Sequence, residues 1–432
     1  MERREHRGVA KPMAMITPPP TAAGIVPSRT RWLMISLVFA ATVINYLDRQ
    51  TLSVLAPVLR EEFGMSNVTY SRIVSAFMLS YTIMNGVSGP LIDRLGTRIG
   101  YALCVLWWSA AAMAHAFSTS ALTFGVFRFL LGMGEAGNWP AGIRVVTEWF
   151  PVKERALASG IFNSGSSIGA LLATPMVVFL SLRFGWRTAF LVVGLSGFVW
   201  LLLWWPSYRL PRKEAGSVPP APPIPVGPLL RTRFVRAFTI AKLFFDPVWY
   251  FYIFWFPEYL KSARHFDMVS IGKYGWIPFL AADLGNLIGG WLCGKLIQAG
   301  LSVNIARKSA VTVFALCMSS AIPAVFVESA SQSIALVSVA MAGYTACNAI
   351  LLSFPADVFP SSSVGSIWGL ASMGSGFGGM LFALITGWVV DHYSYEPVFI
   401  GFGLLPLITT GILWFALGPL EPLTFDTSYP VQ

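Results

Sequence analysis

Long apolar runs alternate with short polar segments along most of this chain, and this alternation determines the expected fold class. Each run approaches the ~20 residues that a helix needs to cross the hydrocarbon of a bilayer. The pattern therefore predicts an all-α membrane protein with 12 transmembrane helices. The runs lie near residues 32–56, 70–92, 99–117, 121–146, 156–180, 187–206, 235–260, 272–298, 309–327, 332–354, 362–390 and 396–418.

One polar break divides these runs into two sets of six. It carries Arg209, Arg212 and Lys213, followed by several prolines. Such a stretch buries little apolar surface and favours extended backbone, which is typical of a linker. We expect a cytoplasmic N-terminal tail (1–31), an N-terminal six-helix bundle (32–206), a cytoplasmic linker (207–233), a C-terminal six-helix bundle (234–418) and a cytoplasmic C-terminal tail (419–432).

The two sets of runs are related by an internal repeat. Glu148-Trp-Phe-Pro151 recurs as Asp357-Val-Phe-Pro360, displaced by 209 residues. The same displacement carries three glycines onto glycines: Gly160 onto Gly369, Gly165 onto Gly374 and Gly169 onto Gly378. The repeat predicts two pseudo-symmetric bundles of parallel topology with a binding site between them at mid-membrane.

Composition and charge agree with a membrane protein. The chain is 55% hydrophobic and only 12% charged, whereas soluble proteins carry about 25% charged residues. Of its lysines and arginines, 19 fall in the segments that would be cytoplasmic if both termini were inside, and seven fall in the outer loops and span ends. The net charge of +10 is thus an orientation signal plus attraction to anionic lipid, and we expect no nucleic-acid partner.

The cysteines and histidines give no sign of a metal site or a cofactor. All four cysteines, Cys104, Cys293, Cys317 and Cys347, fall inside apolar runs. Their spacing matches neither a metal site nor a disulfide framework, so we interpret them as small apolar side chains. We expect no metal and no cofactor.

Four ionisable residues lie inside stretches that should otherwise be in hydrocarbon: Asp48, Arg49, Arg128 and Glu135. A charge at the bilayer centre costs at least ~2.5–3.5 kcal/mol and usually marks a functional path. Arg128 and Glu135 share one face of the fourth span, with Gly132 between them. These residues predict a polar cavity where an anion and a proton are handled together. The alternatives are an ion-pair network that only joins helices, or a division in which Arg49 binds substrate and Arg128 is structural.

A glycine-rich turn follows the second span, with Gly89, Asp93, Arg94, Gly96 and Arg98 in the pattern G-x-x-x-D-R-x-G-T-R. The glycines permit a tight turn, and Asp93 at a helix end can pair with a basic residue, so we interpret the segment as a conformational latch. A solvated turn is the alternative. Gly294 stands where the second half would need the acid, which predicts a weaker latch there.

Residues 165–169 match the nucleophile pattern G-x-S-x-G with Ser167 at its centre. The match lies within an apolar helix, and no histidine is placed to act as a base, so we do not expect an enzyme. The small residues fit a helix-packing face better. Asn163 beside them is a candidate to bond a sugar hydroxyl. The seventh span adds Tyr250 beside Pro247, whose missing N–H is tolerated next to a cavity.

These motifs together resemble the anion:cation symporter family of the major facilitator superfamily. The resemblance is carried by Asn45-Tyr-Leu-Asp-Arg49, Arg128-x-x-x-Gly-x-x-Glu135, Glu148-Trp-Phe-Pro-x-x-Glu-Arg155 and residues 160–169. Asp246-Pro-Val-Trp249 and residues 357–369 are most similar to bacterial hexuronate (galacturonate/glucuronate) transporters. The chain departs from them at Tyr344-Thr-Ala-Cys-Asn348, which leaves the exact sugar acid open.

The resemblance implies a proton-coupled symporter that imports an organic anion, a hexuronate or related sugar acid, by rocker-switch alternating access. By it, Asp48 and Glu135 are protonation sites, Arg49 holds the substrate carboxylate, and Arg128 interacts with Glu135. We expect a monomer in the bacterial inner membrane with both termini cytoplasmic. The substrate-binding candidates are Arg49, Tyr46, Tyr81, Asn163, Tyr250, Tyr344, Asn348 and Ser372.

Other functions stay open at this point. The substrate could be an aldonate such as galactonate, or another carboxylate. An anion exchanger or facilitator would work without protons, and a receptor would bind ligand without moving it.

Overall fold

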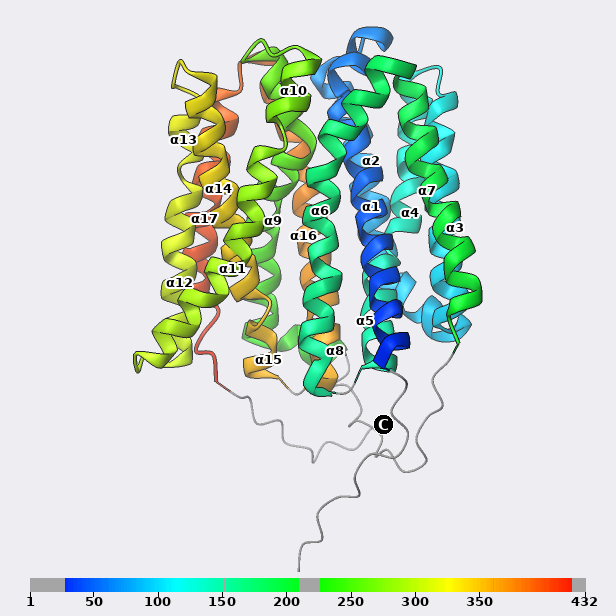
Figure 1. The fold of residues 1–432 in the computed structure, drawn as a ribbon. Helices are drawn as coiled ribbons and strands as arrows, with labels where there is room; N and C mark the ends of the chain where they lie inside the picture. Colours follow the sequence, from blue (N-terminus) through cyan, green and yellow to red (C-terminus); the bar gives the residue numbers. More distant parts are fainter. Residues whose placement is uncertain (1–27, 151, 210–225, 360, 422–432) are drawn as a thin grey trace, which may run out of the picture.

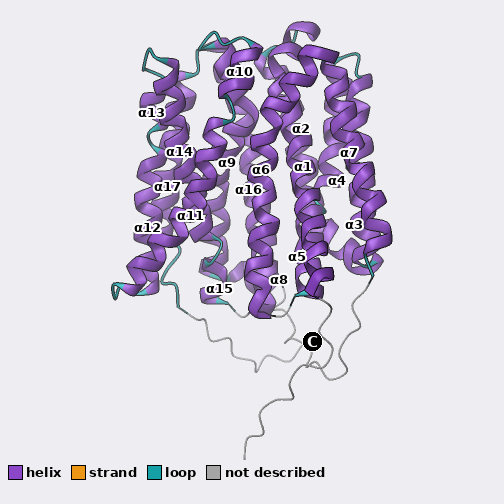
Figure 2. Ribbon diagram, in the orientation of Figure 1, coloured by secondary structure: helices purple, strands orange, loops and turns teal. Residues whose placement is uncertain are grey.

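The computed structural model describes residues 28–150, 152–209, 226–359 and 361–421, which are almost entirely helical (Figure 2). The N-terminal half contains α1 (Ser28–Phe63), α2 (Asn67–Leu95), α3 (Thr97–Ala114), α4 (Ala121–Glu135), α5 (Asn138–Trp149), α6 (Val152–Phe184) and α7 (Trp186–Ser207). The C-terminal half contains α8 (Val226–Arg231), α9 (Arg233–Ser262), α10 (Met268–Tyr274), α11 (Ile277–Gln298), α12 (Val303–Met318), α13 (Ala321–Ala324), α14 (Ala330–Leu351), α15 (Phe354–Val358), α16 (Ser361–His392) and α17 (Glu396–Gly411). A 3-10 helix (His115–Phe117) continues α3, and a π-helix (Ile412–Ala416) continues α17.

Polar residues at the turns start several of these helices. The Ser66 hydroxyl accepts a hydrogen bond from the Thr69 N–H at the start of α2, and Ser120 forms a capping box with Thr123 before α4. Thr232 caps α9 through the Val235 N–H. These side chains satisfy backbone donors that have no partner within the helix.

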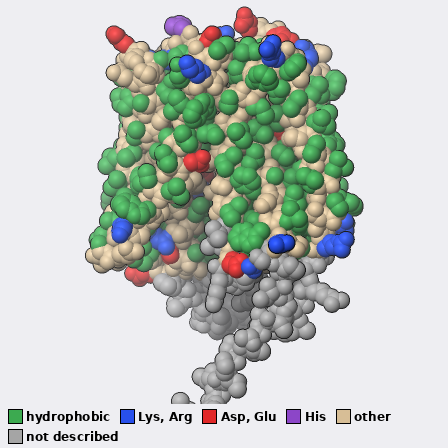
Figure 3. Space-filling view, in the orientation of Figure 1, with side chains coloured by type: hydrophobic (Ala, Val, Ile, Leu, Met, Phe, Trp, Pro, Cys, Tyr) green, Lys and Arg blue, Asp and Glu red, His purple; other side chains and the backbone are tan. Residues whose placement is uncertain are grey.

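On the face drawn in Figure 3, apolar side chains cover most of the middle of the molecule, and most charged side chains lie near its two ends. Leu202, Leu287 and Phe415 are 75%, 73% and 83% exposed. A soluble protein would not leave so many large apolar side chains in water, so this band faces lipid.

The helices form the 12 membrane spans expected from the sequence. Nine segments of the described chain are long and apolar enough to cross a bilayer. Three more spans run the length of the molecule beside them: α2, α9 and the α4–α5 pair (Figure 1). In the described residues, three other spans are also broken into two helical pieces: α10–α11, α12–α13 and α14–α15.

The two halves repeat the same helix packing, which confirms the pseudo-symmetric architecture. A methyl group placed on Gly134 would lie 2.8 Å from the backbone nitrogen of Trp108, and one on Gly343 would lie 2.8 Å from the backbone oxygen of Phe314. Gly134 and Gly343 are 209 residues apart, the displacement found in the sequence. Gly134 lies on α4 and Gly343 on α14, so in both halves the fourth span packs closely against the third span.

The first span of each half packs on the fifth through glycines. Gly169 of α6 contacts the carbonyl oxygen of Val43 on α1, and Gly378 of α16 contacts that of Leu243 on α9. The two glycines are 209 residues apart, but their partners on the first spans are only 200 apart. Residue i of α1 is thus structurally equivalent to residue i + 200 of α9, a register that the sequence repeat did not reveal.

We call the end of the molecule where α1 begins the proximal end, the end where α1 finishes the distal end, and the contact surface between the two halves the seam. Described contacts cross the seam in its distal part. The Ser53 hydroxyl donates to the Ile253 carbonyl at 2.5 Å, and the Tyr70 hydroxyl donates to the Phe254 carbonyl at 2.7 Å. Arg60 forms a buried ion pair with Glu258.

Four glycines in the proximal parts of α2, α6, α11 and α16, the helices that meet along the seam, have open space beside them among the described residues. Added methyl groups at Gly89, Gly160, Gly290 and Gly369 would meet no described atom within 4 Å. The distal hydrogen bonds and ion pair join the two halves, so the structure describes a state in which the seam is closed at the distal end.

Parts of the expected tails and linker lie outside the described residues. The N-terminal tail is described only from Ser28, where α1 already begins, and the linker only at residues 207–209 and 226–233. The C-terminal tail is described only to residue 421.

Candidate functional site

A buried ion pair joins α1 and α4 in the N-terminal half. The Arg49 Nε donates to Glu135 Oε2 at 2.8 Å, and the two side chains are 3% and 0% exposed. Glu135 is the last residue of α4, where the span breaks before α5 begins at Asn138. A break in a membrane helix is tolerated beside a cavity, so this ion pair lies where the fold can accommodate a polar site.

Three aromatic rings surround the Arg49 guanidinium. Its central carbon lies 4.6 Å from the ring centre of Tyr81, 5.0 Å from that of Tyr46 and 5.2 Å from that of Phe77. Such cation–π contacts strengthen when water is excluded. The two predicted tyrosines, Tyr46 and Tyr81, therefore lie directly against the predicted anion-binding arginine.

Arg128 makes its hydrogen bonds to the backbone of α1 next to this ion pair, and not to the Glu135 carboxylate. Its two terminal nitrogens donate to the backbone oxygens of Asp48, at 3.3 Å, and Arg49, at 2.7 Å. The resemblance implied that Arg128 interacts with Glu135; the two charges are close enough to interact electrostatically, while the hydrogen-bonded partner of Glu135 is Arg49. Arg128 is fully buried and fixes the backbone from which Arg49 projects.

Several buried polar atoms near Arg49 have no hydrogen-bond partner among the described residues. They include Arg49 Nη2, Glu135 Oε1, Asp48 Oδ2 and both side-chain polar atoms of Asn45 and Gln50. Buried polar groups are nearly always bonded to protein or water. A cluster of such atoms around one ion pair is the chemistry of a site that receives water or a polar ligand.

A second polar cluster lies in the C-terminal half on α9 and α14. Lys242 Nζ lies 2.7 Å from Asp246 Oδ1 and donates to Asn348 Oδ1 at 3.2 Å. The Tyr344 hydroxyl donates to Asp246 at 2.9 Å. The rings of Phe245 and Trp249 stack on that of Tyr344, with centres 4.6 Å and 5.2 Å away. We call Lys242, Asp246, Tyr344 and Asn348 the α9 cluster.

The two clusters approach each other across the seam. Tyr250 interacts electrostatically with both Asp246 and Arg49, and its hydroxyl lies 3.3 Å from that of Ser375. The Phe77 ring, which lies against Arg49, is 6.2 Å from the Phe254 ring of α9. Arg49 and Glu135 are therefore next to the seam and do not face lipid.

The remaining predicted substrate residues lie at the edge of this region. Asn163 is half-buried on α6, where its carbonyl accepts a hydrogen bond from the Ser166 hydroxyl at 2.7 Å. Ser372 is half-buried on α16, three residues before Ser375. Among the described residues, no hydrogen bond joins either side chain to Arg49.

The expected latch is described only in part. The Asp93 side chain lies outside the described residues, Arg94 is exposed, and Gly96 adopts a positive φ of 78° at the turn between α2 and α3. Arg98 donates to the Trp205 carbonyl of α7 at 2.6 Å. This last contact joins helices of one half and does not cross the seam.

Asp283 was not identified as a candidate from the sequence, although it too is an ionisable residue within an apolar run. It is a carboxylate within the apolar run 272–298, lies half-buried on α11 and interacts with the Ser167 hydroxyl of α6 across the seam. Ser167 therefore lies in the middle of α6 next to Asp283. The serine of a G-x-S-x-G nucleophile motif lies instead on a turn between a strand and a helix.

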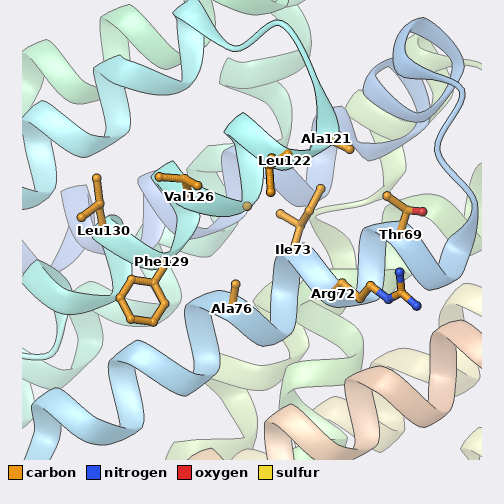
Figure 4. A pocket seen from close by; sticks show the side chains of 10 residues that line it. Thr69, Arg72, Ile73, Ala76, Ala121, Leu122, Val126, Phe129 and Leu130 are labelled. Atoms are coloured by element: carbon orange, nitrogen blue, oxygen red, sulfur yellow. The ribbon is translucent and has the colours of Figure 1, made fainter.

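A groove of about 460 Å³ lies between α2 and α4 on the outer surface (Figure 4). Its lining is apolar apart from Thr69 and Arg72, and Leu122 beside it is 77% exposed. This groove faces lipid and is separate from the two buried polar clusters.

Comparison with curated proteins finds relatives along nearly the whole chain. A hexuronate transporter of Escherichia coli (strain K12) is 33% identical over 408 residues, covering 90% of this chain and 94% of that protein. A galacturonate transporter of Dickeya chrysanthemi is 36% identical over 310 residues, covering 67% and 89%. A D-galactonate transporter of Escherichia coli O6:H1 is 27% identical, covering 88% and 94%.

Comparison with solved structures supports the fold. A bacterial homologue of the human lysosomal transporter Spinster, crystallised in an inward-facing and occupied conformation, superposes with a TM-score of 0.70 at 19% identity, covering 91% of this chain and 96% of that one. The family model for the Major Facilitator Superfamily matches residues 38–366. With twelve spans in two repeated halves and transporters of organic anions among its relatives, this chain belongs to the Major Facilitator Superfamily and is a multi-pass membrane transporter, not an enzyme.

Proposed function

We propose that this protein is a proton-coupled symporter that imports a hexuronate or related sugar acid across the bacterial inner membrane. The observation that carries the proposal is the buried Arg49–Glu135 ion pair at the seam. The transport of hexuronate, galacturonate and galactonate by its relatives supports the substrate class.

Charge balance gives the physical reason for coupling. The two clusters contain three buried cations, Arg49, Arg128 and Lys242, and three buried carboxylates, Asp48, Glu135 and Asp246. An added organic anion leaves this set with one uncompensated negative charge in a low-dielectric region. A proton on Glu135 or Asp48 removes that charge, and a proton on Glu135 also frees Arg49 to bind the substrate carboxylate through two nitrogens. Anion and proton thus favour each other's binding, and this coupling is reciprocal.

The proposed movement is a rocking of residues 32–206 against residues 234–418, joined by the linker 207–233. With both termini cytoplasmic, the distal end would face outward, and the described state would release substrate to the inside. Proton and anion would load when the distal contacts open and would leave together at the proximal end.

Replacing Glu135 by Gln tests the coupling. The amide keeps the size of the carboxyl but cannot take up a proton, so we expect accumulation of galacturonate driven by an imposed pH gradient to fall to the background of empty proteoliposomes. Exchange of labelled for unlabelled galacturonate should remain measurable, because exchange needs no net proton release.

The matched control is Glu328→Gln, a change of the same kind on an exposed loop. It should leave both activities as in the wild type. If Glu135→Gln still accumulates galacturonate against its gradient, Glu135 is not the coupling group. If a protonophore leaves concentrative uptake by the wild type intact, the protein is an anion exchanger or facilitator.

A further inference from the structure

The α9 cluster enters the proposed mechanism only through the charge balance of Lys242 and Asp246, yet three of its four members are almost completely buried. Lys242 and Asp246 are each 5% exposed, and Tyr344 is 5% exposed. Burying an ion pair within a membrane is costly and does not by itself stabilise a fold. The cluster therefore calls for a functional explanation.

The register of the two halves places this cluster at the seam. Because residue i of α1 is equivalent to residue i + 200 of α9, Asp246 occupies the position of Tyr46, and Trp249 occupies that of Arg49. Tyr344 donates to Asp246 and lies near enough to Tyr46 for the two hydroxyls to interact electrostatically across the seam. The α9 cluster thus forms the opposite wall of the region that contains Arg49.

The groups in this wall suit hydroxyls better than a second carboxylate. The Lys242 ammonium is already neutralised by Asp246 at 2.7 Å, so a further anion would meet no free positive charge there. A sugar hydroxyl both donates and accepts, and the cluster offers both functions: Asp246 as an acceptor, Lys242 as a donor and the Asn348 amide as either. Phe245 and Trp249 hold the Tyr344 ring on its two sides, which fixes the hydroxyl that points at Asp246.

We propose that the α9 cluster is the hydroxyl-reading half of the binding site, with Asp246 and Asn348 selecting the configuration of a polyhydroxylated monoanion whose carboxylate is held by Arg49. This inference rests on the proposed function. A substrate of this class bridges the two halves, with its charged end on α1 and its hydroxyl-bearing end on α9 and α14.

The test compares two hexuronates that differ only in the configuration of one hydroxyl-bearing carbon, galacturonate and glucuronate, with the dicarboxylate galactarate. Initial uptake rates into proteoliposomes give kcat/KM for each substrate in the wild type, Asp246→Asn and Asn348→Ala. Glu328→Gln is the matched control for Asp246→Asn. Reconstitution efficiency and monodispersity in detergent check that each variant is folded.

For Asp246→Asn we expect kcat/KM for the preferred hexuronate to fall about tenfold or more, since a hydrogen bond to a charged group is lost. The ratio of kcat/KM for galacturonate to that for glucuronate should move toward one, because the group that discriminates between them has changed. Asn348→Ala should move the same ratio in the same direction, with Arg49 and Glu135 untouched.

Three results would overturn the inference. Equal losses for both hexuronates in both variants would mean a purely structural cluster. A wild type that prefers galactarate, with a selective loss of galactarate uptake in Asp246→Asn, would mean that the cluster handles a second carboxylate. An unchanged ratio with unchanged rates would mean that substrate does not reach α9. A wild type that takes up no sugar acid would instead contradict the proposed function.

Discussion

Arg49 uses its Nε for Glu135 and leaves Nη2 buried without a partner among the described residues. This division matters because a guanidinium can bind a carboxylate through two parallel hydrogen bonds, and an ammonium cannot. Aromatic contacts with Tyr46, Phe77 and Tyr81 fix the plane of the group. The residue is therefore prepared for a planar anion and not only for a positive charge.

Replacing Arg49 by Lys keeps the charge and removes the planar pair of donors. We expect KM for galacturonate to rise about tenfold or more, the loss of one charge-assisted hydrogen bond, while the protein still inserts and folds. Proteoliposome uptake measures KM. Arg183→Lys, an exposed position at the end of α6, is the control and should match the wild type. An Arg49→Lys variant with unchanged KM would show that only charge is needed.

The sequence singled out the charged residues of the candidate site but not how they pair. Asp48, Arg49, Arg128 and Glu135 were identified because ionisable groups inside apolar runs are costly, and the same rule applied to Asp283 would have found it. That Arg49 and not Arg128 meets Glu135 depends on the rotation of α1 relative to α4. Helices that are apolar on all sides carry little periodic signal for that rotation.

At the level of elements, the 12 spans followed from run length, whereas their breaks did not. The α4–α5 break places Glu135 at a helix end, yet the run 121–146 reads as one continuous span. Glycines are frequent in membrane helices for packing reasons, so Gly134 and Gly137 did not distinguish a break from a close helix contact. The 200-residue register of α1 against α9 was likewise invisible, since it follows from where α6 and α16 touch those helices.

Gly169 shows how tightly α6 is packed on α1. A methyl group there would lie 2.6 Å from the Val43 oxygen and 2.8 Å from the Tyr46 Cβ. We expect Gly169→Ala to lower stability by ~1–3 kcal/mol, the usual effect of overpacking, and to raise KM for galacturonate because Tyr46 moves against Arg49.

Gly160→Ala is the matched control, because the added methyl would meet nothing described within 4 Å and alanine is the better helix former by up to ~1 kcal/mol. Thermal unfolding in detergent should therefore give a lower Tm for Gly169→Ala and an unchanged or higher Tm for Gly160→Ala. Equal Tm values in the two variants would contradict the close contact of α6 with α1.

At the scale of the whole molecule, the two halves are also joined at the distal end by a carboxylate, Asp391, which is separate from both the Arg49–Glu135 pair and the α9 cluster. Asp391, at the end of α16, accepts hydrogen bonds from the backbone N–H groups of Asn67 and Val68 at 2.9 Å and 2.7 Å, and from the Asn67 amide at 2.7 Å. These donors form the N-terminus of α2, where the helix dipole favours an anion. A carboxylate of one half thus caps a helix of the other, and the cap exists only while the distal end is closed.

Replacing Asp391 by Asn weakens this cap and should shift the population toward the state that is open at the distal end. The helix-terminus interaction amounts to ~0.3–1 kcal/mol, so we expect the open fraction to rise about two- to fivefold. A cysteine placed at Ser75, which is 7% exposed and contacts Met380 across the seam, reports this opening through its rate of labelling by a membrane-impermeant maleimide added at the distal face. The parent protein without that cysteine gives the background, and Glu328→Gln on the same end is the charge control. Because labelling requires the seam to part, a rate that does not change in Asp391→Asn would mean that the α1–α9 contacts alone, including Arg60 with Glu258, hold the distal end closed.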